Sequence, residues 1–468
     1  MSVVGSSLSS GANRFLSASS ARIRCRRSLS LLLMTLVVPG SAQLVAGNKA
    51  VGRVAVRVWL GVLGFALLLA LLAVTHRSAI LTLVTDPALL LGMQVSLILL
   101  ALAWMALFCD AWRLGDPRAL RRGQRLAMVG VNGALCIVTG GALLFSAHLV
   151  SVQRDFIAAV FSGGEVYDPT AGRYNVLLLG GDSGSQRSGM RPDSISVASI
   201  DEDTGKTVLF GLPRNMENVP FPDGSVMAEQ FPDGFACRGC FLNGVYTWAT
   251  DHAELFPGVK KPGEVATEQA VEAITGLPIH YYAMVNLKGF RDLVDAVGGI
   301  TIDVPEEIPI GGIGGAVTGA VPAGVHKLDG YQTLWFARSR VADDDYSRMA
   351  RQKCVMSAML QQLKPRTVLT HVQEIADASK ALLSTNLPAS ELDTFIGLAL
   401  KARSQPVGTV SFVPPTIATY DPDYELIHTM VVDAIAKSEG EPTDGRQAAR
   451  ANRRAKAANR TDDLAAAC

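Results

Sequence analysis

Three long apolar runs near the N-terminus constrain this chain most, because each is long enough to cross the hydrocarbon core of a bilayer. They cover residues 54–74, 89–108 and 126–150. A fourth apolar stretch, residues 29–47, is interrupted by Pro39 and by glycines, so we predict that it is interfacial or re-entrant. The sequence therefore predicts a membrane protein anchored by three helices.

Arginine clusters beside these runs set the predicted topology. Five arginines lie between residues 14 and 27, and five more lie in the loop 109–125. Short loops rich in Lys and Arg remain in the cytoplasm, so both clusters are predicted to be cytoplasmic. This requires three spans and places the chain after residue 150 outside. A fourth span at 29–47 would put the second cluster on the wrong side.

Changes in composition predict the remaining boundaries. The cytoplasmic N-terminus, with the 29–47 segment, covers residues 1–53, and the three spans lie within 54–150. A linker over 151–172 leads to an extracytoplasmic domain over 173–432. Residues 433–468 contain few large apolar side chains and are predicted to be a disordered tail.

The exported domain alternates strand patterns with helix patterns. Expected strands are "YNVLLLGGD" (174–182), "SISVASID" (194–201), "TVLFGLP" (207–213), "YYAMVNL" (281–287) and "ITIDVP" (300–305). Apolar residues at helical spacing predict helices over 264–275 and 288–297, each ending at glycine. Such alternation predicts an α/β fold with a helix-flanked mixed, largely parallel sheet. Residues 311–324 are glycine-rich and are expected to form a flexible loop.

The stretch "FARSRVADDDYSRMARQK" (336–353) contains four arginines at a spacing that changes part-way. "LWFARSR" has strand composition, which would put Arg338 and Arg340 on one strand face. The later part has helical composition, so Arg348 and Arg351 would share a helix face. A strand, a turn and a helix would then gather four guanidiniums around one anion. The alternative is a solvated surface of ion pairs with the intervening aspartates.

Two other strand ends carry similar groups. Asp182, Arg187, Arg191 and Asp193 follow the first strand, and Arg214 with Asn215 follows the third. If these groups converge with the four arginines and Asp345, seven arginines face three aspartates, which leaves a surplus of four positive charges. Uncompensated buried charge is costly, so this surplus predicts a multiply charged anion. Arginine forks match phosphate oxygens, and carboxylates can hold Mg²⁺ beside phosphates.

These motifs resemble the LytR–CpsA–Psr (LCP) family, actinobacterial type. The resemblance covers residues 173–363 and the membrane anchor, and it rests on "NVLLLGGD", "RPDSISVASID", "LPRN", "LNGVYT" and "LDGYQTLWFARSR…DYSRMARQK". It implies a membrane-anchored phosphotransferase that moves a glycopolymer from a polyprenyl-pyrophosphate carrier onto peptidoglycan, forming a phosphodiester. The implied partners are this lipid-linked glycan, the peptidoglycan acceptor and membrane lipid, with arabinogalactan as the leading polymer and teichoic-acid-like or capsular polymers as alternatives.

The resemblance also implies roles for individual residues. Asp182 and Asp193 would coordinate Mg²⁺ (or Mn²⁺) or activate the acceptor hydroxyl, and Asp345 would orient arginines or metal. The groups that would hold the pyrophosphate are Arg191, Arg214, Arg338, Arg340, Arg348 and Arg351, supported by Gln352. Arg187, Asn215 and Asn243 complete the expected substrate-binding set. The common "PRD" of the family is "PRN" here, so Asn215 supplies no carboxylate.

The residues leave other activities open. A hydrolase would use the same site with water in place of the sugar hydroxyl, and a non-catalytic wall-polymer binder would need only the arginines. Expected linings of a lipid tunnel, each with ordinary core as the alternative, are Phe210, Leu212, Tyr281, Tyr282, Val285 and Leu293.

Net charge and cysteines limit the remaining classes. The net charge of +1 argues against a nucleic-acid binder. Cys237 and Cys240 form "CRGC" in the exported part, where a local disulfide is predicted, with free thiols as the alternative. A zinc knuckle would need a second ligand pair, which the sequence does not supply.

Overall fold

A computed structural model describes residues 23–75, 82–161, 164–182, 191–312, 315–341, 344–362, 383–440 and 460–461. The chain forms two compact units, Met1–Asp155 and Phe156–Cys468, which are described separately below.

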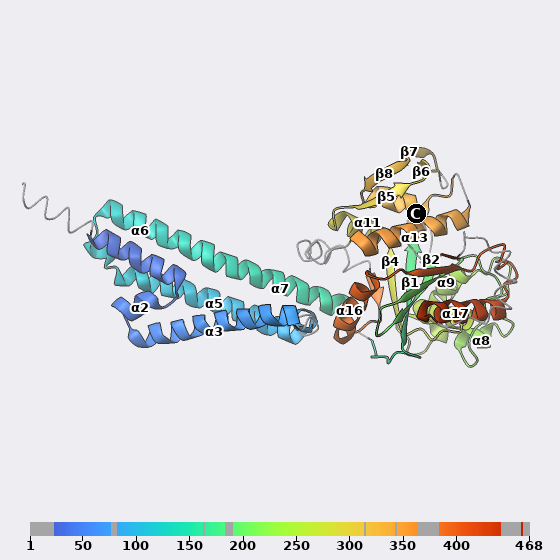
Figure 1. The fold of residues 1–468 in the computed structure, drawn as a ribbon, viewed down its shortest axis with the longest axis horizontal. Coiled ribbons are helices and arrows are strands. Elements are labelled where there is room, and N and C mark those ends of the chain that lie inside the picture. Colours follow the sequence, from blue (N-terminus) through green and yellow to red (C-terminus); the bar gives the residue numbers. More distant parts are fainter. Residues whose placement is uncertain are drawn as a thin grey trace, which may run out of the picture. The chain divides into compact units, whose positions relative to one another are not determined.

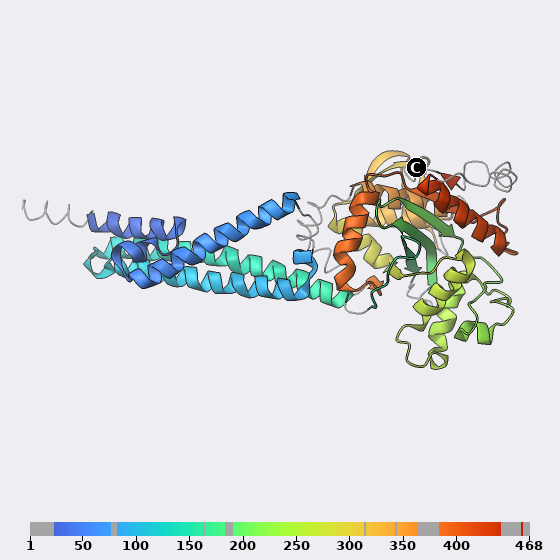
Figure 2. The same ribbon diagram turned by 60° about the horizontal axis from the view of Figure 1, so that its bottom comes forward.

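Three apolar helical segments dominate the first unit. They are α3 (Lys49–Thr75), α5 (Pro87–Leu114) and a continuous run of α6 (Arg122–Leu135), η2 (Cys136–Gly140) and α7 (Gly141–Val160). The short η1 (Pro117–Ala119) lies in the loop before α6. Each segment is long and apolar enough to cross a membrane, so the structure has the three candidate spanning helices that the sequence predicted (Figures 1 and 2). Because α7 continues to Val160, the first part of the predicted linker is helical.

The predicted interfacial segment is a pair of short helices. Residues 23–37 are helical, Gly40 turns the chain with a φ of 92°, and α2 (Ser41–Ala46) follows. Hydrogen bonds tie the pair to α5 and the residue after it: Trp104 Nε1 donates to Thr35 O, Gln43 Nε2 to Leu107 O, and Ser28 Oγ to Gly115 O. The segment thus packs against α5 and is not one of the three spanning candidates.

The second unit contains a seven-stranded sheet with the order β11-β10-β3-β2-β1-β4-β9. The strands are β1 (Arg173–Asp182), β2 (Arg191–Asp201), β3 (Thr207–Leu212), β4 (Tyr281–Asn286), β9 (Leu383–Thr385), β10 (Gly408–Ser411) and β11 (Arg460–Thr461). The pairs β1–β4 and β3–β10 are parallel, whereas the other four neighbouring pairs are antiparallel. The fold is therefore the predicted mixed α/β class, with long strands where the sequence predicted them.

Parallel pairs are the minority among these described strands, so the expectation of a largely parallel sheet is wrong in that respect. The reason lies in the short connection between β2 and β3, which can only reverse the chain. Asp201 Oδ1 accepts from the Thr204 N–H at 2.7 Å, and Gly205 has a φ of 72°. This tight turn joins β2 and β3 as an antiparallel hairpin.

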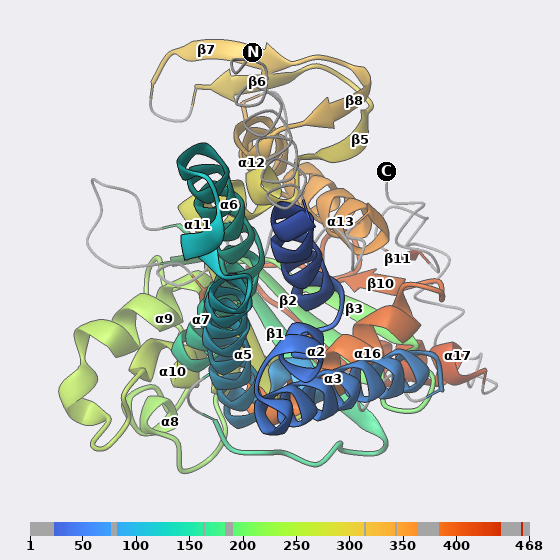
Figure 3. The same ribbon diagram turned by 90° about the vertical axis from the view of Figure 1, so that its left-hand side faces the viewer.

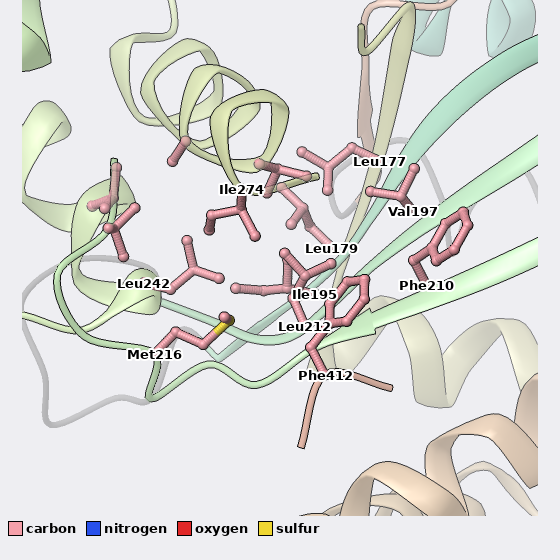
Figure 4. Packing of buried hydrophobic residues seen from close by; sticks show 14 of the residues in the cluster. Leu177, Leu179, Ile195, Val197, Phe210, Leu212, Met216, Leu242, Ile274 and Phe412 are labelled. Atoms are coloured by element: carbon pink, nitrogen blue, oxygen red, sulfur yellow. The ribbon is translucent and has the colours of Figure 1, made fainter. Parts of the chain in front are cut away.

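Helices cover both faces of this sheet. On one face, α9 (Leu242–Asp251), α10 (Pro262–Thr275) and α17 (Tyr424–Glu439) enclose the main core, whose members include Leu177, Leu179, Phe210 and Phe412 (Figure 4). On the other face, Met356 and Leu360 of α13 (Asp345–Gln362) pack against Ala198 and Leu209. Period-two alternation along β1 and β2 thus separates the two faces. Shorter elements are α8 (Val226–Gln230), η3 (Ala253–Leu255), η4 (Ala389–Glu391) and α16 (Leu392–Ala402).

A smaller group of strands lies at one end of the unit, over α12 (Gly330–Arg338) (Figures 1 and 3). It comprises β5 (Ile300–Val304) paired with β8 (Gly324–Leu328), and β6 (Ile308–Gly311) paired with β7 (Val317–Val321). Their apolar residues share a separate core with Phe336 and with α11 (Leu287–Ala296) and α13. Residues 311–324 therefore contain strand β7 rather than only a loop, and "ITIDVP" lies outside the central sheet.

The segment "LWFARSR" is mostly helix α12, so its prediction as a strand is wrong. A capping box starts this helix: Asp329 accepts from the Gln332 N–H at 2.7 Å, and Gln332 accepts from the Asp329 N–H at 3.2 Å. This reciprocal pair satisfies the first free N–H groups and overrides the β propensity of Leu334, Trp335 and Phe336. Arg338 is the last residue of the helix, and Arg340 follows in a loop.

The C-terminal boundary also differs from the prediction. Helix α17 continues to Glu439 and buries Val431 and Ala434, so residues 433–439 belong to the fold rather than to a tail. Residues 460–461 pair with β10. The rest of the predicted tail lies outside the described residues.

Candidate active site

A cavity of about 350 Å³ lies in the second unit between the sheet and helices α11, α12 and α13. Its walls are mostly apolar and include Leu178, Ala283, Val285, Leu293 and Met359. Its polar lining residues include Asp193, Arg338, Arg340, Arg348 and Gln352. The cavity lining therefore combines guanidiniums and a carboxylate with a mostly apolar wall, which suits an amphiphilic ligand with an anionic head.

Three segments bring charged groups together beside this cavity. Asp193 stands near the start of β2, Arg214 follows β3, and Asp345 begins α13. Arg214 bridges the two carboxylates, with Nη1 2.5 Å from Asp193 Oδ1 and Nη2 3.3 Å from Asp345 Oδ1. Arg348 Nη1 donates to the Asp193 carbonyl oxygen at 2.7 Å, so the network also holds the backbone of β2.

Asp345 contacts three guanidiniums. Arg348 donates to both of its oxygens, at 3.2 and 2.9 Å, and Arg340 Nη1 lies 3.7 Å from Oδ1. Arg214 supplies the third contact. Burial raises the pKa of Asp345, but the contacts with these arginines outweigh it and hold the pKa below its usual range. Asp345 is thus an anion whose contacts orient the three arginines.

Positive charge exceeds negative charge among these groups. Burial lowers the pKa of Arg340, and repulsion from the neighbouring Arg214 lowers it further. Arg214, Arg338, Arg340 and Arg348 face two described carboxylates, those of Asp193 and Asp345. The surplus of two positive charges favours binding of a multiply charged anion.

The four arginines of the opening motif divide into different environments. Arg338, Arg340 and Arg348 line the cavity, but Arg351 does not. Arg351 is 8% exposed and donates through Nε to Phe336 O at 2.7 Å and through Nη2 to Ser339 O. It therefore binds carbonyls at the end of α12, and its position does not support the predicted contact with pyrophosphate.

The three predicted amide residues also differ in position. Gln352 lines the cavity and donates to Ala337 O at 3.3 Å. Asn215 Nδ2 lies 3.4 Å from Thr419 Oγ1, and the backbone N–H of Asn243 donates to Arg214 O at 3.0 Å. Asn243 thus holds the backbone of Arg214, Asn215 contacts Thr419, and neither residue lines the cavity.

The model of the LytR_cpsA_psr family matches residues 146–417, more than half of the chain. The chain belongs to the LytR_cpsA_psr family. The family suggested by the sequence motifs is therefore confirmed.

Curated relatives come from several bacteria. The chain is 29% identical over 233 residues to the polyisoprenyl-teichoic acid–peptidoglycan teichoic acid transferase TagU of Oceanobacillus iheyensis, covering 49% of this chain and 64% of that protein. It is 24% identical over 310 residues to the cell wall biosynthesis protein LcpA of Corynebacterium glutamicum, covering 58% of each. The matches thus span less than two thirds of these relatives. A crystal structure of Bacillus subtilis TagV is similar at 20% identity and a TM-score of 0.41, over 58% of this chain and 99% of that one.

The structure describes only part of the segment from Asp182 to Arg191, which was predicted to contribute to the site. Asp182 ends β1, and its backbone pairs with Arg191 at the start of β2. Arg191 is exposed and does not line the cavity. Arg187 lies within 183–190, outside the described residues. Within the described residues, no group of three His, Cys, Asp or Glu side chains converges as a metal site.

Cys237 and Cys240 form a disulfide in the structure, with their Cα atoms 5.0 Å apart. The bridge closes a loop just before α9, and Cys240 packs against the main core. The pair lies outside the cavity lining, so it supports the fold around Arg214 and Asn243 rather than contacting a ligand.

Sequence reasoning found some cavity residues and missed others. Val285 and Leu293 line the cavity as expected, whereas Phe210, Leu212, Tyr281 and Tyr282 are buried in core clusters. The missed linings Leu178 and Ala283 face the opposite side of the sheet from Leu177 and Tyr282, so period-two alternation was the available signal.

Lys353 was also missed. It is 7% exposed, and burial lowers its pKa to about 8. It lines a small void of about 10 Å³, next to the main cavity, together with Asp193 and Gln352. Lys353 follows Gln352 in a helix that also contains arginines, so the sequence did not indicate that its side chain is buried.

Proposed function

We propose that this protein is a membrane-anchored phosphotransferase that moves a glycopolymer from a polyprenyl-pyrophosphate carrier onto peptidoglycan. The observation that carries this proposal is the union of an apolar cavity with Arg338, Arg340 and Arg348 in its lining. An apolar tail within the cavity would leave its charged head beside these arginines. Few biological ligands combine a long hydrocarbon with two linked phosphates, and a polyprenyl pyrophosphate is one of them.

The charges support a pyrophosphate rather than a single carboxylate. Arg214, Arg340 and Arg348 are held in place by Asp345, so they need little reorganisation when an anion arrives. The two phosphates would neutralise the surplus positive charge of the site. Planar guanidiniums donate in pairs to phosphate oxygens, which fixes the pyrophosphate in one orientation.

The chemical step follows from this orientation. An acceptor hydroxyl oxygen of peptidoglycan attacks the phosphorus that carries the glycan, and the bond from that phosphorus to the bridging oxygen breaks. A phosphodiester forms, and polyprenyl phosphate leaves. Asp193, which lines the cavity, takes the hydroxyl proton, while the arginines stabilise charge on the phosphate oxygens.

We further propose that Mg²⁺ (or Mn²⁺) assists at Asp193 together with Asp182. Asp193 contacts Arg214 through Oδ1, and Mg²⁺ at phosphate sites commonly takes one or two carboxylates with the phosphates themselves. Carboxylates are ligands that a hard cation prefers, so these two aspartates would supply its protein ligands. When bound, the ion would neutralise part of the pyrophosphate charge.

The membrane anchor and the relatives support the setting of this reaction. Three helices long enough to span a bilayer precede the second unit, which we place outside the cell membrane with the N-terminus in the cytoplasm. TagU is named as acting on teichoic acid, and LcpA as acting in cell wall biosynthesis. The polymer here is proposed to be arabinogalactan or a similar secondary wall polymer.

The test incubates the full chain in detergent with a lipid-pyrophosphate glycan and peptidoglycan fragments, with and without Mg²⁺. Mass spectrometry should detect glycan joined to peptidoglycan by a phosphodiester. Asp193→Asn should retain the lipid but lose this product. Release of free phosphorylated glycan alone would indicate a hydrolase, and ligand binding without any product would indicate a binding protein; either result would refute the transferase.

A further inference from the structure

Helix α12 carries three contacting side chains on one face. Tyr331, Trp335 and Arg338 are spaced at i, i+4 and i+7, so they lie one above another along the helix. The rings of Tyr331 and Trp335 are 6.4 Å apart in an edge-to-face arrangement. The Arg338 guanidinium lies over the Trp335 ring, 5.7 Å from its centre. We name these three residues the α12 strip.

The strip is accessible, although it consists largely of aromatic surface. Tyr331 is 45% exposed, and Trp335 is half-buried against the core formed by β5–β8 and α13. An exposed tyrosine packed on a second ring is a common feature of binding surfaces, because a ring offers a large contact area at a low entropic cost. The core does not need Tyr331, since Phe336 of the same helix is 1% exposed and supplies the packing.

The strip is continuous with the cavity of the candidate active site. Leu334, Ala337 and Arg338 of the same helix line that cavity, so Arg338 belongs to both surfaces. A group bound on Tyr331 and Trp335 would therefore lie directly beyond the arginines that face the pyrophosphate in the proposed function.

We propose that the α12 strip binds the first sugars of the donor glycan, those attached directly to the pyrophosphate. This inference rests on the proposed function and extends it to a sugar-binding subsite. Sugar rings present C–H groups that pack on the electron-rich faces of aromatic rings, while their hydroxyls accept hydrogen bonds from Arg338 and from the indole N–H.

Geometry favours the donor glycan over the acceptor. The first donor sugar is covalently bonded to a phosphate, so it must lie next to the arginines that contact that phosphate. The acceptor hydroxyl, in contrast, must approach the phosphorus on the side opposite the leaving phosphate. A surface that begins at a phosphate-facing arginine therefore suits the donor.

The experiment compares two ligands on the full chain in detergent. One is a polyprenyl pyrophosphate without sugar, and the other is the same lipid carrying a disaccharide. Tyr331→Ala should weaken binding of the glycosylated lipid by about three- to tenfold and leave the sugar-free lipid unchanged. Trp335→Leu also removes the ring beneath Arg338, so it should weaken binding of the glycosylated lipid more than that of the sugar-free lipid. Arg338→Ala should weaken binding of both.

Conservative variants separate stacking from folding. Tyr331→Phe and Trp335→Phe keep a ring at each position and should retain most of the preference for the glycosylated lipid. If the ring-removing variants reduce binding of both lipids equally, or of neither, the α12 strip does not bind the sugar and the inference is overturned. If the wild-type chain binds neither lipid, the proposed function fails, and the inference falls with it.

Discussion

Arg340 and Arg351 provide the sharpest contrast between a ligand-binding arginine and a structural one. Arg340 follows α12 in a loop, lines the cavity and reaches Asp345 only at 3.7 Å. Arg351, eleven residues later in α13, is buried and donates to two backbone carbonyls. Replacing each by alanine should therefore affect stability and ligand response in opposite ways.

The structure sets the size of each effect. Without ligand, Arg340→Ala removes a distant ion pair and relieves repulsion with Arg214, so the free energy of unfolding should stay within about 1 kcal/mol or rise. Arg351→Ala removes two hydrogen bonds from a buried cation, each worth roughly 1.5–3 kcal/mol. It should therefore lower the free energy of unfolding by roughly 3–5 kcal/mol.

Inorganic pyrophosphate supplies the second readout. At about 100 times its dissociation constant, a ligand stabilises the native state by about 2.7 kcal/mol, and tenfold weaker binding reduces this to about 1.4 kcal/mol. Arg340→Ala should show this reduction, whereas the folded fraction of Arg351→Ala should keep the wild-type response.

The assay measures thermal unfolding of the second unit within the full chain, with and without pyrophosphate. Limited proteolysis detects the unfolded fraction at each temperature. Arg340→Lys should restore only part of the response, because an ammonium lacks the planar fork of donors. The reasoning is refuted if Arg340→Ala unfolds the unit as strongly as Arg351→Ala and leaves the pyrophosphate response of the folded fraction unchanged. Arg340 would then be a structural ion-pair partner.

Three further predictions concern stability, the disulfide and topology. Burial lowers the pKa of Lys353 from 10.5 to about 8, so the unfolded chain binds more protons between these values and stability rises with pH there. Lys353→Met should therefore raise the free energy of unfolding by roughly 3 kcal/mol at pH 7, and this gain should shrink from pH 8 to 10. A difference in free energy of unfolding between variant and wild type that does not change with pH would contradict this. Mass spectrometry without reduction should find Cys237 joined to Cys240, and two free thiols after export would disprove the bridge. A reporter that is active only outside the cell membrane, fused after Gly440, should be active; a reporter active only in the cytoplasm would overturn the three-span topology.

The elements with strong periodicity could be predicted from the sequence. Strand β1 and helix α10 each have one pattern over their length and a clear glycine at the end, so local and tertiary preferences agree. Whether neighbouring strands run parallel or antiparallel could not be predicted, because it depends on which strands pair in the sheet. The hairpin between β2 and β3 changed the character of the sheet through a turn of a few residues.

The candidate site was predicted in part for a similar reason. The spacing of Arg348 and Arg351 correctly predicts one helix, but it does not say what each turn of that helix contacts. Arg348 reaches β2 and Asp345, while Arg351, one turn later, reaches the end of α12. The helical state of α12 was missed because its signal, the capping box at Asp329, lies before the segment whose composition suggests a strand.

The central claim is that a hydroxyl of peptidoglycan, and not water, attacks the glycan-bearing phosphorus. Running the reaction of the full chain in H₂¹⁸O, with a lipid-pyrophosphate glycan and peptidoglycan fragments, tests it most directly. We expect a phosphodiester between glycan and peptidoglycan that contains no ¹⁸O, formed together with unlabelled polyprenyl phosphate. A phosphorylated glycan that contains ¹⁸O and is not attached to peptidoglycan would contradict the claim, because it would show that water is the attacking group.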